Sequence, residues 1–224
     1  MFVTRSMTEK VITISQDEGI LKARDLMKEK KIRHLPVVED NGTLIGIVTD
    51  RDIRSAMPSN LLDADIQQKI EQVAAMKVAD VMTKNPLTLS PLYTIQDALL
   101  LIQEKRVGAF PVVDDKGKLL GILSVRDLLR AFTNVLGIGE PGTLIGVLIE
   151  EKVGQMKKIV DAVTEENIAV GSILVARYWD DKKRAVFPYL LTNNVVRVKK
   201  KMEELGFELI DPMKWYLDRL PKND

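Results

Sequence analysis

Apolar and polar residues alternate with two different periods along the first 57 positions. An extended run at 11–15 precedes residues 19–31, where apolar side chains recur three or four positions apart and predict an amphipathic helix. Apolar runs at 34–40 and 43–49 predict two strands, and Asn-Gly at 41–42 predicts the tight turn between them. A second helix is expected directly after residue 49.

The same pattern returns 75 positions later. Residues 7–57 align with 82–132 without a gap, and 20 of the 51 pairs are identical, which identifies an internal repeat. The second copy of the elements is expected at 86–90, 94–106, 109–115 and 118–124, followed by its own final helix. One unit of about 50 residues buries too little surface to be stable alone, so we expect the two copies to pack together.

A third segment follows the glycine-rich stretch GIGEPG. Its periodicity predicts, in order, a strand at 143–149, a helix at 154–166, strands at 170–179 and 184–191, a helix at 195–205 and a strand at 207–210. This βαββαβ order is typical of a ferredoxin-like domain. The expected fold class is therefore α+β, with two packed repeats and a C-terminal ferredoxin-like domain.

The domain boundaries follow from these elements. We expect a first repeat at 1–57, a connector helix at 58–77, a second repeat at 78–135, a linker at 136–141, the third domain at 142–212 and a tail at 213–224. Trp215 and Tyr216 in the tail are expected to pack on the sheet of the third domain.

Composition narrows the function classes. The formal net charge is +1, so no strong field favours nucleic acid, and Lys199–Lys201 is interpreted as a solvated helix face. No apolar run approaches the roughly 18 residues of a membrane helix, and the first ten residues lack a signal-peptide core. The chain has no cysteine, which excludes disulfides and thiolate chemistry, and a cytoplasmic protein is the simplest expectation.

Each repeat ends on the same eight-residue motif, GIVTDRDI from Gly46 and GILSVRDL from Gly121. Its hydroxyl and carboxylate residues are Thr49 and Asp52 in the first copy, and Ser124 and Asp127 in the second. One interpretation is a capping box, in which the hydroxyl and the carboxylate bond to the first turn of the helix. The other is a ligand site, because a helix N-terminus favours phosphate and a carboxylate accepts from ribose hydroxyls, with Arg51 or Arg126 adding charge.

These repeats resemble a tandem pair of CBS domains, also called a Bateman module. The resemblance covers roughly residues 1–135 and rests on the Pro-Val-Val strand, the turn glycine and the Gly-x-x-(Thr/Ser)-x-x-Asp ending. It implies an adenosine ligand such as AMP or ATP, with the Asp on the ribose and the Thr or Ser near the phosphate. It also implies that Thr13 and Thr88 line the adenine pocket.

The two copies differ just before the proline that both strands contain, Pro36 and Pro111. The first has Arg33 and His34, whereas the second has Gly108 and Ala109. In the proteins that the repeats resemble, basic residues here reach the phosphates in the neighbouring repeat's cleft. We therefore expect Arg33 and His34 to serve the Asp127 site, which would bind phosphorylated adenosine more tightly than the Asp52 site. The alternative for His34 is a partly buried residue at a strand end that binds no ligand.

The third segment resembles an ACT domain, a module that commonly senses amino acids across a dimer interface. The resemblance rests on its element order and on Gly154, which would form the ligand loop at the start of the first helix. A ferredoxin-like dimerisation module without a ligand is the alternative. The order CBS, CBS, ACT resembles the acetoin-utilisation protein B family.

Together these features predict a cytoplasmic, homodimeric regulator that senses an adenine nucleotide, needs no other cofactor, and acts on an unidentified protein. The sequence has one histidine, no P-loop and no G-x-G-x-x-G, so we expect no enzyme. The alternatives are a structural dimerisation scaffold with empty clefts, and a sensor of S-adenosylmethionine.

Overall fold

A computed structural model describes residues 2–57, 66–176 and 183–210. The chain divides into two compact units, residues 1–130 and 131–224. Among the described helices, none is both long and apolar enough to cross a membrane.

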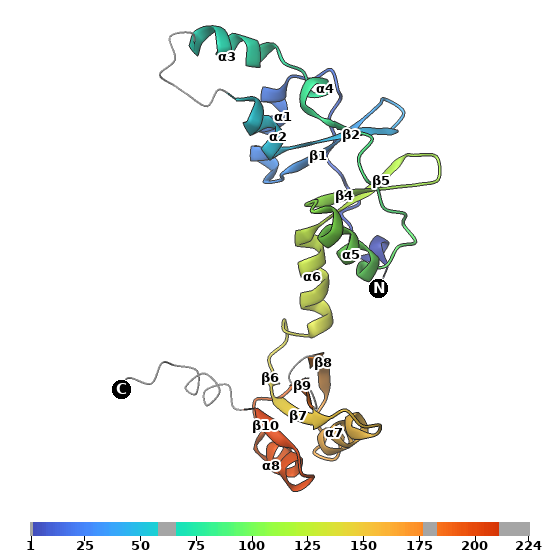
Figure 1. Ribbon diagram of the computed structural model, residues 1–224, viewed down its shortest axis with the longest axis vertical. Coiled ribbons are helices and arrows are strands. Elements are labelled where there is room, and N and C mark those ends of the chain that lie inside the picture. Colours follow the sequence, from blue (N-terminus) through green and yellow to red (C-terminus); the bar gives the residue numbers. More distant parts are fainter. Residues whose placement is uncertain (1, 58–65, 177–182, 211–224) are drawn as a thin grey trace. The chain divides into compact units, whose positions relative to one another are not determined.

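The first repeat contains the two predicted helices and the predicted hairpin in the predicted order, preceded by a 3₁₀ turn that was not predicted (Figure 1). They are a 3₁₀ turn η1 (Val3–Arg5), α1 (Ile20–Lys30), β1 (His34–Val38), β2 (Leu44–Thr49) and α2 (Asp50–Ala56). The turn between the strands has Gly42 at φ +85°, and the Asn41 side chain accepts a hydrogen bond from the Thr43 N–H at 2.7 Å. These two residues provide the left-handed conformation and the local acceptor that a tight turn requires.

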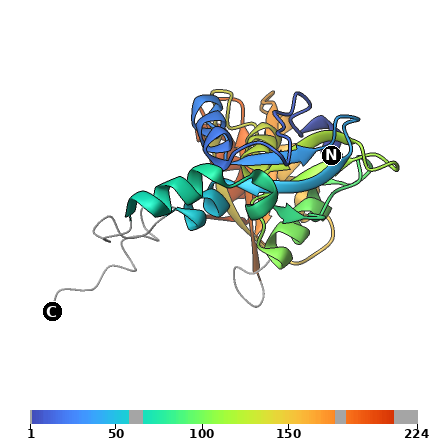
Figure 2. The same ribbon diagram turned by 90° about the horizontal axis from the view of Figure 1, so that it is seen from above.

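The second repeat repeats this order. Its elements are α4 (Val78–Val81), β3 (Thr83–Lys84), α5 (Ile95–Lys105), β4 (Ala109–Val113), β5 (Leu119–Ser124) and α6 (Val125–Leu136). The connector contains α3 (Ile66–Ala75), which lies beside α1 in both views (Figure 1, Figure 2). The rest of the predicted connector, 58–65, lies outside the described residues.

The strand pairs of the two repeats have the same register. His34 pairs with Thr49, and Ala109 pairs with Ser124 at the position 75 residues later. Both hairpins also shift register at the same place, between Val37 and Val38 and at its equivalent in β4. The internal repeat predicted from the sequence is therefore a repeat of structure, and each copy has its own apolar core.

The leading segment of each repeat pairs with the sheet of the other repeat. β3, which opens the second repeat, pairs with β2 of the first. Correspondingly, Thr8 of the first repeat forms a bridge with Ile122 of the second, and the chain then returns to its own repeat, where Ile14 bridges Val37. The runs 11–15 and 86–90, expected to be extended, make one isolated bridge each and no regular strand, because they span the gap between two sheets.

This crossing explains the glycine that opens each motif. A Cβ on Gly121 would lie 2.5 Å from Met7 Sδ, and one on Gly46 would lie 2.6 Å from Met82 Sδ. Each methionine thus packs directly on the glycine backbone of the opposite repeat. The two hairpin turns also pair, with Leu44 N–H donating to the Gly117 carbonyl at 3.0 Å. The two repeats interlock through the main chain as well as through side chains.

The C-terminal unit contains an antiparallel sheet and two helices. Its elements are β6 (Thr143–Leu144), β7 (Gly146–Glu150), α7 (Gln155–Thr164), β8 (Val170–Ala176), β9 (Lys183–Leu190), α8 (Val196–Glu204) and β10 (Glu208–Ile210). Among the described residues, the sheet has the order β10-β7-β9, with β8 on the other edge of β9 and β6 at the end of β9. The strand predicted at 143–149 is divided in two at Ile145.

One face of this sheet forms the core of the unit. Val147 and Val186 on the strands, Ile159 on α7 and Val198 and Met202 on α8 are all buried in one cluster. The 3.6-residue period of each helix directs its apolar stripe to the same sheet face. The last residues of the predicted strand 170–179, and Trp215 and Tyr216, lie outside the described residues.

Candidate functional site

A cavity of about 560 Å³ opens between the two repeats in the first unit. Part of the lining comes from residues 3–14, which run from the second repeat to the first and are called the crossing segment below. The rest comes from the end of α1 with the start of β1, and from β5 with the start of α6. Five cationic side chains and one carboxylate line it: Lys10, Lys31, Arg33, Arg126, Arg130 and Asp127. The excess of positive charge makes the cavity suited to an anionic ligand.

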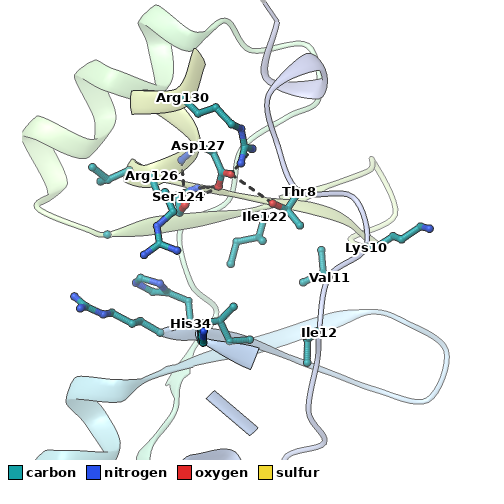
Figure 3. Close-up of a pocket in the computed structure, with 15 residues that line it drawn as sticks. Thr8, Lys10, Val11, Ile12, His34, Ile122, Ser124, Arg126, Asp127 and Arg130 are labelled. Atoms are coloured by element: carbon teal, nitrogen blue, oxygen red, sulfur yellow. Dashed lines mark hydrogen bonds and ion pairs between the residues drawn. The ribbon is translucent and has the colours of Figure 1, made fainter. Parts of the chain in front are cut away.

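Asp127 is held at the start of α6 by a capping box. Its Oδ2 accepts from the Ser124 N–H at 2.9 Å and from Ser124 Oγ at 2.6 Å, and its own N–H donates to Ser124 Oγ at 3.3 Å. Figure 3 shows these bonds on the wall of the cavity. The carboxylate is 5% exposed. The capping box therefore accounts for one of the two carboxylate oxygens of Asp127, Oδ2.

The second oxygen, Oδ1, faces other partners. Arg130 Nη2 donates to it at 2.7 Å, and Thr8 Oγ1 lies 3.4 Å away at the long limit of a hydrogen bond. A carboxylate oxygen has more than one lone pair, so Oδ1 can accept from a ligand hydroxyl that enters the cavity. The two sequence interpretations are thus compatible: Oδ2 closes the helix while Oδ1 remains at the cavity.

The side of the cavity opposite Arg126 carries a cluster of apolar side chains. Val11, Ile12 and Ile122 form it, and Figure 3 shows them on one side of Asp127 with Arg126 and His34 on the other. In the described part of the chain, neither the N–H nor the carbonyl of Ile12 bonds to another main-chain group. A flat heterocycle with ring acceptors and an exocyclic amine can bond to such a free edge while it packs on the aliphatic side chains.

Arg33 and His34 from the first repeat line the same cavity as Asp127 from the second. The His34 ring lies against Gly108, where a Cβ would be 2.9 Å from His34 Nε2. Burial, together with the neighbouring Arg33 guanidinium, lowers the pKa of His34 below 6.5, while the Asp52 carboxylate acts in the opposite direction. His34 is therefore held mainly as a neutral side chain at pH 7.

The equivalent residues of the first repeat are arranged differently. Asp52 Oδ2 accepts from the Thr49 N–H at 2.8 Å and from Thr49 Oγ1 at 2.7 Å, as in the second copy. However, neither residue lines the cavity, and Arg51 does not line it either. Gly108, which was expected to face the Asp52 side, lines the Asp127 cavity beside His34.

The two threonines expected at the adenine pocket do not reach this cavity. Thr13 and Thr88 are absent from its lining, which includes Lys10, Val11 and Ile12 instead. In the first repeat, the crossing segment meets the cavity one to three residues earlier than the family resemblance implied. The structure does not place these two threonines at this cavity, and their role at an adenine pocket stays a prediction.

Four polar or charged lining residues were not identified from the sequence: Thr8, Lys10, Lys31 and Arg130. A signal existed for Thr8, because its equivalent Thr83 is identical. Lys31 also has a basic equivalent, Arg106, whereas the equivalents of Lys10 and Arg130 are Asn85 and Ser55. Only the crossing of the leading segment brings Lys10 to the cavity.

Gly154, the predicted ligand-loop residue, precedes α7 with φ +91°. No atom lies within 4 Å of the position its Cβ would take. Glycine is needed here for the left-handed conformation rather than for a close approach. The described part of the chain contains no group of three or more His, Cys, Asp or Glu side chains that could hold a metal ion.

The two repeats are similar to known proteins. A model of the CBS domain family matches residues 3–59 and 78–134. A CBS domain-containing protein of Dictyostelium discoideum is 34% identical over 136 residues, which cover 61% of this chain and 94% of that protein. CBS pairs also occur within enzymes, and this chain spans only 21–25% of the length of several enzymes that it matches.

Two solved structures have the same fold over the repeats. CBSX2 from Arabidopsis thaliana, crystallised in complex with AMP, is 32% identical with a TM-score of 0.50, covering 58% of this chain and 95% of that one. A putative acetoin utilization protein (AcuB) from Vibrio cholerae is 26% identical with a TM-score of 0.53, covering 63% of this chain and 98% of that one.

Proposed function

The chain belongs to the family of CBS-domain proteins, and from this premise we propose that it is a non-enzymatic regulator that binds an adenine nucleotide in the Asp127 cavity. The observation that carries the proposal is the combination of a buried carboxylate with a cation-rich lining in one cavity between two repeats. That CBSX2 was crystallised with AMP supports the ligand class.

The lining suggests how the three parts of a nucleotide would bind. The ribose hydroxyls would donate to Asp127 Oδ1, and the adenine would pack on Val11 and Ile12. The phosphates would then extend to the opposite side, toward Arg126 and the pair Arg33 and His34. Charge-assisted hydrogen bonds of this kind are the strong ones in phosphate recognition.

The charge of the cavity favours nucleotides over S-adenosylmethionine. The sulfonium centre of S-adenosylmethionine is positive, and a lining of five cationic side chains and one carboxylate would repel it. A nucleotide carries two to four negative charges on its phosphates and gains from the same field. We therefore propose AMP, ADP or ATP as the ligand.

Binding would regulate a separate protein by shifting a conformational equilibrium. The cavity is built from both repeats, so a ligand that contacts both stabilises the arrangement in which they are correctly spaced. It can do so only by its differential affinity for two arrangements. We propose a homodimer as the regulatory form, and the regulated protein is unidentified.

For the C-terminal unit we propose a ferredoxin-like domain of the ACT type that serves dimerisation or amino-acid sensing. The support is its strand order β10-β7-β9-β8 with α7 and α8 on one face. A role in acetoin utilisation is part of the proposal, and its support is the likeness to AcuB from Vibrio cholerae.

Isothermal titration calorimetry of the full chain tests the proposal. AMP, ADP, ATP, S-adenosylmethionine and the common amino acids are each titrated into the wild-type protein and into Asp127→Ala. We expect saturable binding of at least one nucleotide to the wild type and a large loss in the variant. If no nucleotide binds and the melting temperature is unchanged by any of them, the chain is a structural scaffold instead.

A further inference from the structure

The carboxylate at the cavity depends on one residue of α6 that the family motif does not include. We propose that Arg130 is a positioning residue: its guanidinium holds Asp127 Oδ1 toward the cavity as the acceptor for the ribose hydroxyls. This inference rests on the proposed function and adds the residue that orients Asp127 for binding the ribose.

The first argument is the pattern of partners on the two carboxylates. Both Asp52 and Asp127 use Oδ2 in a capping box of nearly equal distances. Their Oδ1 atoms differ: Arg130 Nη2 donates to Asp127 Oδ1 at 2.7 Å, whereas among the described residues nothing bonds to Asp52 Oδ1. Ser55 stands where the repeat would place an arginine.

The second argument is burial. Asp127 is 5% exposed, and a carboxylate removed from water is costly unless a charged partner and further hydrogen bonds compensate it. Asp52 is only partly buried and keeps more of its hydration. Arg130 is therefore the charged partner of the buried Asp127 carboxylate, beside the two Ser124 donors.

The third argument is that the Arg130 guanidinium has a second partner, although its side chain is 58% exposed. The same Nη2 lies 3.4 Å from the Ser6 carbonyl on the crossing segment, two residues before Thr8. The guanidinium thus links α6 to the segment that forms the adenine side of the cavity. These two contacts favour one orientation of the Asp127 side chain before any ligand arrives.

A thermodynamic cycle separates positioning from a direct phosphate contact. AMP and 2′,3′-dideoxy-AMP are titrated into wild type, Arg130→Ser and Arg130→Lys. The dideoxy ligand has the same phosphate and base but no hydroxyl for Asp127. If Arg130 acts through Asp127, Arg130→Ser lowers the affinity for AMP about ten-fold or more and changes the affinity for dideoxy-AMP less than about two-fold.

The lysine variant and a second arginine provide the controls. Arg130→Lys keeps the charge and recovers part of the AMP affinity. Arg54 pairs with Asp50 on α2 and does not line the cavity, so Arg54→Ser removes an equal charge without changing either affinity. Retained binding of dideoxy-AMP also shows that Arg130→Ser is folded.

Two results overturn the inference while the proposed function stands. One is an equal loss for both ligands in Arg130→Ser, which indicates a direct phosphate contact. The other is unchanged AMP affinity in that variant. If the wild type binds neither ligand, the proposed function fails, and the inference fails with it.

Discussion

The imidazole of His34 in the first repeat occupies the space beside Gly108 of the second, so that Nε2 is 2.9 Å from where a Cβ on Gly108 would lie. This contact joins the two repeats at the edge of the cavity. It also explains the difference between the copies, because a side chain at position 108 would compete with the His34 ring.

Replacing Gly108 by alanine tests this contact. The backbone of Gly108 does not have a positive φ, so alanine is tolerated locally, but its methyl group must displace the ring. We expect AMP affinity to fall several-fold, with a loss of stability of about 1 kcal/mol. Calorimetry and urea unfolding measure the two effects.

Gly139→Ala is the matched control, since no atom lies within 4 Å of its Cβ position. It should leave the affinity unchanged. Equal AMP affinity in wild type and Gly108→Ala would mean that the His34 ring does not contribute to the site.

The single histidine gives a direct pH readout. Its pKa in the folded protein lies below 6.5, so the unfolded chain binds more protons around pH 6. The contribution of His34 to stability is therefore full above pH 6.5 and is lost as the pH falls through the folded-state pKa. A titration of the only imidazole signal by NMR measures this pKa.

Two perturbations should move the His34 pKa upward. Arg33→Ala removes the neighbouring positive charge, and AMP adds a phosphate that stabilises the imidazolium. A pKa that does not respond to AMP would place the phosphate away from His34.

The sequence predicted most of the fold of the repeats and part of the site. Hydrophobic periodicity located α1, β1, β2 and their copies, because each of these elements directs its apolar side chains to the core of its own repeat. It could not show that residues 7–8 pair with the other repeat, since this depends on the packing of two sheets rather than on local pattern. Lys10 was missed for that reason, and Thr13 was named instead. Arg130 lies three residues after Asp127 on the same helix, a local spacing that predicts an ion pair but was not used.

Residues 3–8 should stabilise the second repeat, although they precede the first in the sequence. Val3 is fully buried in the core that contains Phe110 and Leu123. Val3→Ala removes about two buried methyl groups and should lower the free energy of opening by about 2 kcal/mol. Native-state hydrogen exchange at the amides of β4 reports this value for the second repeat alone.

Val153 provides the matched control for this substitution, because its side chain is fully exposed. Val153→Ala should leave the exchange of β4 amides unchanged. If Val3→Ala also leaves it unchanged, residues 3–8 do not pack on the second repeat.

A capping box elsewhere in the chain separates helix capping from ligand binding. Thr94 and Asp97 form one with bond lengths of 2.8, 2.7 and 3.2 Å, and neither lines the cavity. Asp97→Ala and Asp127→Ala should both lower the melting temperature. Only Asp127→Ala should also weaken AMP binding, by about ten- to a hundred-fold.

If Asp97→Ala and Asp127→Ala both kept the wild-type affinity for AMP, Asp127 would serve only as a helix cap. Asp127→Asn serves as a second variant, because its amide oxygen can still accept from Ser124 while the negative charge is lost. It should retain most of the melting temperature and lose most of the affinity.

A crystal structure of the full chain with AMP tests the central claim most directly. The account predicts one nucleotide in the cavity between the repeats, with its ribose hydroxyls within hydrogen-bond distance of Asp127 Oδ1 and its phosphate beside Arg126 and His34. A nucleotide bound elsewhere in the chain, or a ribose that makes no contact with Asp127, would contradict it.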